Sequence, residues 1–372
     1  MRATRRGLQP LRRLAVLGAL LLALAACNGD DGEAAPALTP TPTPEPDLDD
    51  PADGALPTPT PTAADDDATD EQEETDGPPP APLPSDSWTL LDEAPVALTE
   101  VAGAAFLGDL WIAGGFTADG AATSAVRAYD PTFGTWQDMP ALPGGVHHAA
   151  LVGTDDGLLL LGGYVGSGFD QPTDAVLRFD PATGDWEPTD PLPAARAAGA
   201  AAYDGNRVVY GGGVGPEGLA GDVFMLEAGG WRAGGELSEA REHLAAASDG
   251  AGRVWFLAGR TGGLDTNLTA VDLVVDGGAP QRIGDLPTAR GGLAGFYADG
   301  VGACAVGGED PDRTYAEVEC IDGEGEVSTL PALGQPRHGL GADVIEGVAY
   351  AVLGGPEPGL AVSATVEALG LD

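Results

Sequence analysis

The chain has 372 residues, and its 58 acidic residues against 17 basic ones give a formal net charge of −41. All 17 basic residues are arginine, which excludes a lysine Schiff-base enzyme, a Walker-type phosphate lysine and a general nucleic-acid binder. The 58 glycines and 32 prolines favour a turn-rich fold over a helical bundle.

Residues 1–26 have the pattern of an export signal. Arginines within residues 2–13 precede the apolar run 14–26, which is too short to span a bilayer as a stable helix. The run ends in Leu24-Ala25-Ala26-Cys27, which resembles the lipobox of bacterial lipoproteins. This resemblance implies a signal peptide cleaved before Cys27 and a lipid on the Cys27 thiol. The mature protein would then be an extracytoplasmic lipoprotein, at a cell surface or in a periplasm, whose only contact with the membrane is its anchor.

Residues 27–86 form a predicted linker. From residue 28 onward it contains 14 prolines, 17 acidic residues and no basic residue, and the threonine–proline alternation favours extended polyproline II. Such a segment buries too little apolar surface to offset the entropy of ordering it, so we expect it to be disordered. Its expected role is a stalk that holds the folded part away from the membrane.

Residues 87–372 contain a repeat. A glycine pair, intact or degraded, ends an apolar run six times, and its first glycines are residues 114, 162, 212, 259, 307 and 354. This spacing of 47 to 50 residues is typical of a propeller blade built from four short strands. A tryptophan precedes four of these pairs by 26 to 28 residues, at Trp88, Trp136, Trp186 and Trp231. Aromatic, diglycine and tryptophan at this spacing resemble the Kelch repeat, which also occurs in the propeller domain of galactose oxidase.

The resemblance implies an all-β, six-bladed Kelch-type β-propeller with four-stranded blades. In the third unit the strands are expected at 197–204, 207–212, 222–227 and 231–235. The last unit lacks a fourth strand after 364–369, whereas segment 88–92 is a strand without a blade. We therefore predict that the N-terminal strand completes the last blade and removes the open edge. An open β-sandwich would leave that strand unexplained. We expect a monomer.

Candidate binding residues fall in the connections between blades. The leucines that follow each tryptophan position align, and four residues after them stand Val146, Arg196, Arg241, Arg290 and Arg337. The four histidines of the chain lie in the same connections, at His147, His148, His243 and His338. We predict that these side chains lie at one edge of the channel near the propeller axis.

Three interpretations of this edge are open. The arginines could pair with carboxylates and brace the loops, or the histidines could bind a metal, although four guanidinium groups would repel it. The preferred interpretation is a cationic ring that binds an anion, a carboxylate or a sulfate, on an otherwise acidic domain. Its predicted ligand-binding residues are Arg196, Arg241, Arg290, Arg337, His148, His243 and His338. No metal or other cofactor is expected.

The resulting functional hypothesis is a recognition module that binds a protein or an acidic glycan through the channel-edge loops. No catalytic residue is assigned. The alternative is a sugar mutarotase similar to the bacterial N-acetylneuraminate epimerases, which are also extracytoplasmic six-bladed Kelch propellers. The copper–radical chemistry of galactose oxidase is not expected, because its tyrosine–cysteine pair has no match. Cys304 and Cys320, on neighbouring predicted strands, could form a disulfide or remain buried thiols.

Overall fold

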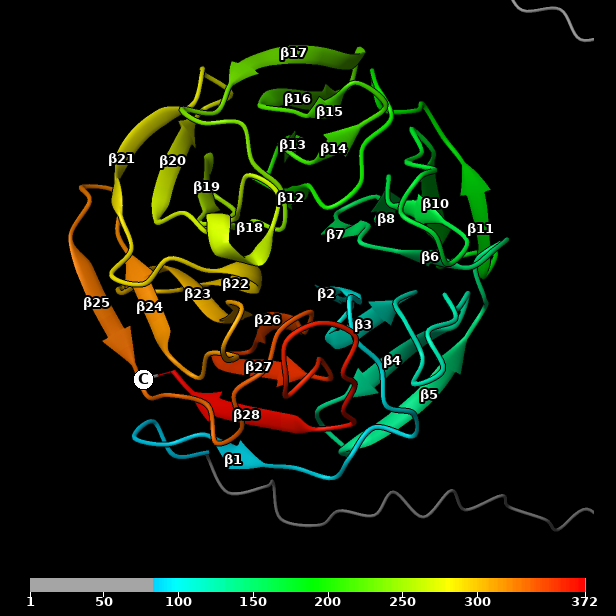
Figure 1. The fold of residues 1–372 in the computed structure, drawn as a ribbon. Coiled ribbons are helices and arrows are strands. Elements are labelled where there is room, and N and C mark those ends of the chain that lie inside the picture. Colours follow the sequence, from blue (N-terminus) through cyan, green and yellow to red (C-terminus); the bar gives the residue numbers. More distant parts are fainter. Residues whose placement is uncertain (1–82, 372) are drawn as a thin grey trace, which may run out of the picture. The chain divides into compact units, whose positions relative to one another are not determined.

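The structure, a computed structural model, describes residues 83–371. The chain divides into two units, 1–74 and 75–372, and the described residues all belong to the second. The predicted signal peptide, Cys27 and the linker up to residue 82 lie outside the described residues. The second unit is a ring of six β-sheets around a central axis (Figure 1).

Each blade of the ring is a four-stranded antiparallel sheet, whose strands we call a to d from the axis to the rim. Blades 1 to 3 consist of β2 (Ala102–Phe106), β3 (Asp109–Ala113), β4 (Val126–Asp130) and β5 (Thr135–Met139); β7 (Ala150–Thr154), β8 (Gly157–Leu161), β10 (Val176–Asp180) and β11 (Asp185–Pro188); and β12 (Ala200–Tyr203), β13 (Val208–Gly211), β16 (Asp222–Glu227) and β17 (Gly230–Glu236). Blades 4 to 6 consist of β18 (Ala245–Ser248), β19 (Arg253–Leu257), β20 (Ala270–Val275) and β21 (Gln281–Asp285); β22 (Gly291–Ala298), β23 (Gly302–Glu309), β24 (Val318–Ile321) and β25 (Val327–Leu330); and β26 (Gly341–Ile345), β27 (Val348–Val352), β28 (Val366–Gly370) and β1 (Thr89–Leu90).

The d-to-a connections and the b-to-c loops lie on the same face of the ring, which we call the loop face. Two short strand pairs are part of it, namely β6 (Val146–His147) with β9 (Tyr164–Val165), and β14 (Val214–Gly215) with β15 (Gly218–Leu219). A 3₁₀ helix at Leu264–Thr266 is the one helical element in the described range 83–371, and no helix there is long and apolar enough to cross a membrane.

The N-terminal strand closes the ring, as the sequence predicted. Strand β1 pairs antiparallel with β28, and Thr89 lies opposite Ala368. The buried Trp88 donates its indole N–H to the carbonyl of Pro331, 2.8 Å away in blade 5. The Pro84 carbonyl accepts a hydrogen bond from Gly370, so the packed part of the chain begins a few residues before the predicted boundary at 87.

The tryptophans join neighbouring blades. Trp186 in blade 2 donates its indole N–H to the Pro140 carbonyl at the end of blade 1, and Trp231 in blade 3 donates to Asp190 at the end of blade 2. Buried aliphatic and aromatic side chains fill the space between the sheets, whereas small residues occupy the strands nearest the axis. Because the sheets diverge outward, large side chains are needed at the rim and small ones at the centre.

The glycine repeat has a different register from the predicted one in blades 4 and 6. The backbone takes positive φ at two successive residues in every blade, and the second of these is a glycine with φ between 90° and 109°. In blades 4 and 6 the first residue is Ala258 or Leu353, with φ of 49° and 62°. The prediction that Gly259 and Gly354 are the first residues of their pairs is therefore wrong, because each holds the second place.

Candidate functional site

The six d-to-a connections form a closed ring of backbone hydrogen bonds at one end of the central channel. One residue of each connection faces the axis, and we call these six the axial ring: Glu100, His148, Ala198, His243, Gly292 and Gly339. Going round from His148, each N–H donates to the carbonyl of the preceding ring residue, and the Val101 N–H closes the ring on the Gly339 carbonyl. These hydrogen bonds therefore tie each of the six connections to its neighbours around the mouth of the channel.

All six residues of the axial ring have a left-handed backbone, with φ between 50° and 66°. Glycine adopts this conformation freely, whereas other residues pay about 1–3 kcal/mol. Blades 5 and 6 have glycine there, whereas blades 1 to 4 have Glu100, His148, Ala198 and His243, and all of these except Ala198 have a titratable side chain. Because strained residues concentrate at functional sites, these three side chains mark the centre of the candidate site.

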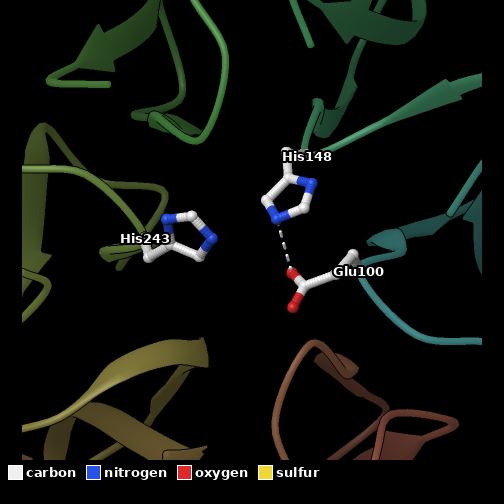
Figure 2. A group of neighbouring side chains, drawn as sticks. All are labelled: Glu100, His148 and His243. Carbon is white, nitrogen blue, oxygen red and sulfur yellow. Dashed lines mark ion pairs between the residues drawn. The ribbon is translucent and has the colours of Figure 1, made fainter. Parts of the chain in front are cut away.

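The three side chains converge across the mouth (Figure 2). The Nε2 atom of His148 lies 3.2 Å from a carboxylate oxygen of Glu100, and the rings of His148 and His243 are 4.7 Å apart. One ligand-type atom from each of the three residues lies within 4.8 Å of the other two. They border a cavity of about 80 Å³ at the mouth, which is large enough to hold water.

Burial and charge set the ionisation of this group. Burial raises the pKa of Glu100, but His148, the other nearby histidines and Arg260 outweigh it and lower the pKa to about 2. Burial lowers the pKa of His148 to about 3, although the Glu100 carboxylate acts in the opposite direction. The two shifts have different causes, because the neighbouring cations favour the ionised form of Glu100, whereas burial favours the neutral form of His148.

A chain of hydrogen bonds sets the tautomer of His148. The Nε2 atom of His147 lies 3.1 Å from the Gly168 carbonyl, which can only accept, so Nε2 of His147 carries the hydrogen. The Nδ1 atom of a neutral His147 is then an acceptor, and it lies 2.6 Å from Nδ1 of His148. His148 therefore donates from Nδ1, and in its neutral form the lone pair of its Nε2 faces Glu100.

A charged cluster lies beside the axial ring in blades 4 and 5. Arg260 Nε is 3.2 Å from a Glu242 oxygen, and Arg260 Nη1 is 3.0 Å from a Glu309 oxygen. The Glu242 carboxylate also lies 3.2 Å from Nδ1 of His243. Two carboxylates thus neutralise the arginine nearest to the mouth.

His338 supports Glu100 from the opposite side. Its Nδ1 and Nε2 atoms lie 3.1 Å and 2.6 Å from the carbonyl oxygens of Gly355 and Gly359. Its Nε2 atom is also 3.5 Å from the second carboxylate oxygen of Glu100. Both ring nitrogens of His338 therefore have a carbonyl partner, and the ring lies beside the Glu100 carboxylate.

Aromatic side chains form the wall of the mouth in blades 1 and 2. The rings of Phe116 and Tyr164 lie 4.1 Å and 5.3 Å from the His147 ring. Phe169, in the b-to-c loop of blade 2, packs on His147 and His148 at 5.0 Å and 5.5 Å, yet 56% of it is exposed. The mouth is therefore asymmetric, with an aromatic wall opposite a charged one.

The predicted cationic ring is wrong for three of its arginines. Arg241, Arg290 and Arg337 are fully buried, and their guanidinium groups lie 2.8–2.9 Å from carboxylates. Each partner is on strand c of the blade that the arginine leads into, in the order Asp272, Glu319 and Glu367. Each arginine also donates to a carbonyl of strand b. They brace the connections and do not reach the channel.

Arg196 differs because its blade has lost the equivalent carboxylate. Phe224 stands where blades 4 to 6 have Asp or Glu, and the Arg196 guanidinium lies 5.6 Å from the centre of that ring. Arg196 turns instead to Asp222, 2.7 Å away, and its side chain is 11% exposed. It is therefore also paired, outside the axial ring.

The comparisons with known proteins agree with this architecture. The Kelch motif matches residues 97–143, around blade 1. The human Kelch repeat and BTB domain-containing protein 13 is 36% identical over 126 residues, which cover 31% of this chain and 26% of that relative. The solved structure of YjhT superposes with a TM-score of 0.62 at 14% identity, over 74% of this chain and 95% of YjhT. The fold is a six-bladed Kelch propeller.

The matched part spans about a quarter of the human relative, so that similarity concerns repeats and not a whole protein. The similarity to YjhT concerns the fold alone. Nothing in these likenesses assigns a role to the residues at the mouth of this Kelch propeller.

The histidines of the mouth stand out in the sequence, whereas its acidic residues do not. The aligned leucines begin with Leu142 in the second connection, and His148 stands six residues after it. One connection earlier, the same six-residue offset leads from Ala94 to Glu100. The missed signal is weak because the first connection has alanine in place of leucine and follows a strand that belongs to the last blade. Glu242, Glu309 and Arg260 were hidden among the many charged residues of this acidic chain.

The structure joins Cys304 and Cys320 by a disulfide. The two residues face one another across strands β23 and β24 of blade 5, and both are fully buried. The bond therefore links the two middle strands of blade 5, away from the channel mouth.

Proposed function

We propose that the protein is a lipid-anchored extracytoplasmic recognition module that binds a protein partner through the loop face of its propeller. The observation that carries this proposal is Phe169, which is 56% exposed beside the mouth and yet packed against two histidines. An exposed aromatic side chain that is already held in place has the properties of an interface anchor. A role in protein interaction is also common among Kelch propellers.

Other apolar side chains on the loop face support a protein partner. Val165 and Leu360 are 47% and 54% exposed, and Leu219 is 38% exposed. They lie in b-to-c loops of blades 2, 6 and 3, so a surface that contacts several blades would cover them together. Apolar and aromatic groups rimmed by polar loops are typical of protein–protein interfaces.

The charge of the chain favours a partner with basic groups over an acidic glycan. Arg241, Arg290 and Arg337 are buried in ion pairs, so they do not offer a cationic ring to an acidic ligand. The whole chain is also strongly acidic. Binding of a basic protein surface should therefore weaken as salt is added, because exposed charges are screened.

The proposed location rests on Cys27 and on the oxidised cysteine pair. A lipid on Cys27 and the predicted stalk would present the propeller outside the cytoplasm, where the disulfide of Cys304 and Cys320 is stable. Replacing Cys27 with serine should move the protein from the membrane fraction to the soluble fraction. Retention in the membrane fraction would contradict the anchor.

The partner proposal can be tested by photo-crosslinking with two matched phenylalanine positions. A photoreactive phenylalanine analogue replaces Phe169 on the loop face or Phe133 on the c-to-d turn of the opposite face, where the side chain is 73% exposed. We expect one defined protein adduct from position 169, competed by unlabelled wild-type protein and weakened by salt, and none from position 133. Equal adducts at both positions, or binding confined to acidic sugars on a glycan array, would contradict the proposal.

A sugar mutarotase is the second candidate, because Glu100 and His148 place a carboxylate and an imidazole in one concave mouth. Such a pair could exchange protons with an anomeric hydroxyl and a ring oxygen. The ionised Glu100 would, however, repel the carboxylate of an acidic sugar. Incubation with N-acetylneuraminate, followed by NMR, distinguishes a mutarotase from a recognition module. Accelerated anomer exchange that is lost in Glu100→Gln would favour the mutarotase.

A further inference from the structure

We propose that Glu100, His148 and His243 form a zinc-binding site at the mouth of the propeller channel. The three side chains come from three different d-to-a connections, and one ligand-type atom from each lies within 4.8 Å of the others. Figure 2 shows a ring nitrogen of His243 and one of His148 turned toward the space beside the Glu100 carboxylate.

The backbone supports this assignment. All three residues have a left-handed conformation that glycine would adopt without strain, as Gly292 and Gly339 do at the equivalent positions of blades 5 and 6. The chain thus places ligand-type side chains at strained positions in blades 1, 2 and 4. Packing alone does not require this, because Ala198 fills the same place in blade 3.

The hydrogen bonds around His148 leave one strong donor atom without a hydrogen. Gly168 fixes the tautomer of His147, which in turn takes the Nδ1 hydrogen of His148. The lone pair of His148 Nε2 then faces the Glu100 carboxylate at 3.2 Å. Two electron-rich atoms at this distance repel each other unless a proton or a metal ion lies between them, and a metal ion held by both atoms would take the place of that proton.

The groups around the three ligands have the arrangement of an outer shell. The Glu242 carboxylate lies 3.2 Å from Nδ1 of His243, and the other nitrogen of that ring faces the space beside Glu100 (Figure 2). His338 lies 3.5 Å from the second oxygen of Glu100. Arg260, the nearest guanidinium, is neutralised by Glu242 and Glu309. The repulsion that four arginines would have exerted is absent, because three are buried in pairs elsewhere and Arg196 is paired with Asp222.

The donor set selects the ion. Two imidazoles and one carboxylate are suited to zinc, which takes three protein ligands and leaves a fourth position open. The cavity of about 80 Å³ between the three residues can hold water at that position. Calcium and magnesium prefer six or more oxygen ligands, and this site offers one carboxylate.

Zinc binding by the full chain tests the proposal. Protein stripped with a chelator is titrated with zinc chloride by calorimetry, and the coordination is followed with cobalt(II), whose visible absorption distinguishes four-coordinate from six-coordinate ions. We expect one tight zinc per chain and a four-coordinate cobalt spectrum. Glu100→Gln should weaken zinc binding at least about 100-fold, whereas Glu326→Gln, which removes one exposed carboxylate elsewhere, should not change it.

Two further variants separate loss of ligands from loss of fold. His148→Ala and His243→Gly copy the residues that blades 3 and 5 already have at these positions, and thermal melting checks that each remains folded. In the double variant the tight zinc and the four-coordinate spectrum should both disappear. Wild-type protein that binds no stoichiometric zinc, or a folded double variant that binds zinc as tightly as wild type, would overturn the proposal. The latter result would assign the binding to acidic residues elsewhere in the chain.

Discussion

The residues of the axial ring combine two demands on one backbone position. The turn from strand d to strand a needs a left-handed residue, because the N–H of each ring residue must reach the carbonyl of its neighbour. Glycine meets this first demand, the left-handed backbone, but not the second, which is a side chain that faces the channel. Glu100, His148 and His243 supply side chains and retain strain, which is a common trade between stability and function.

The strain at His243 predicts an unusual response to glycine. We expect His243→Gly to leave the free energy of unfolding unchanged or to raise it by up to about 1 kcal/mol, because glycine relieves the positive φ of 50°. Ala246→Gly, in the neighbouring strand β18, should lower it by about 0.5–1 kcal/mol, as glycine does in an ordinary strand. Chemical denaturation measures both. If His243→Gly proved as destabilising as Ala246→Gly, backbone strain would not distinguish this position.

His147 should influence the metal site without binding the ion. We expect His147→Phe to weaken zinc binding about 10- to 100-fold, because His148 loses the acceptor that fixes its tautomer. The new ring would lie among Phe116, Tyr164 and Phe169, so the melting temperature should change little. Calorimetry and thermal melting give the two readouts. Wild-type zinc affinity in this variant would show that the tautomer does not control the site.

At the scale of an element, the arginine and the strand-c carboxylate behave as one unit. Blades 4, 5 and 6 contain both, while blade 2 has Val146 and Leu177 at the two places. The sequence showed the arginines in register but did not reveal their partners, because acidic residues are too frequent for one spacing to stand out. Burial decides their role, and burial depends on how the connection folds back over strands b and c.

The pair in blade 6 predicts a strong coupling between two substitutions. Arg337→Met alone should lower the free energy of unfolding by about 3–5 kcal/mol, because it leaves Glu367 buried without its cation. Adding Glu367→Leu should restore more than half of that loss, since blade 2 is stable with two apolar residues there. Denaturation of both single variants and the double variant measures the coupling.

The exposed pair of Arg282 and Asp285 provides the control for this cycle. Their atoms are 2.6 Å apart, but both side chains are at least 40% exposed, so Arg282→Met should change stability by less than about 1 kcal/mol. Additive losses at Arg337 and Glu367 would contradict the view that they act as one brace.

At the scale of the whole molecule, the repeat in the sequence was sufficient to predict the fold but not the site. Six similar units with one strand missing at the C-terminus have few ways to bury their edges, and closing the ring is the simplest. The register of Gly259 and the place of Glu100 depend on backbone turns that differ from blade to blade. The candidate site at the mouth consists of such departures from the repeat, which a consensus pattern averages out.

Closure itself rests on the short N-terminal segment. Strand β1 has two residues, so its pairing with β28 would be weak without Trp88, which is buried and bonded to blade 5. We predict that deleting residues 83–91 from the full chain lowers the free energy of unfolding by about 3–5 kcal/mol, as expected for loss of a buried tryptophan. The uncovered edge of β28 should also make the protein associate, because free strand edges pair with one another. Deleting residues 65–73 of the predicted linker removes the same length of chain and should do neither. Denaturation and light scattering measure both effects, and a monomeric, equally stable protein after loss of 83–91 would mean that the axial ring alone keeps the propeller closed.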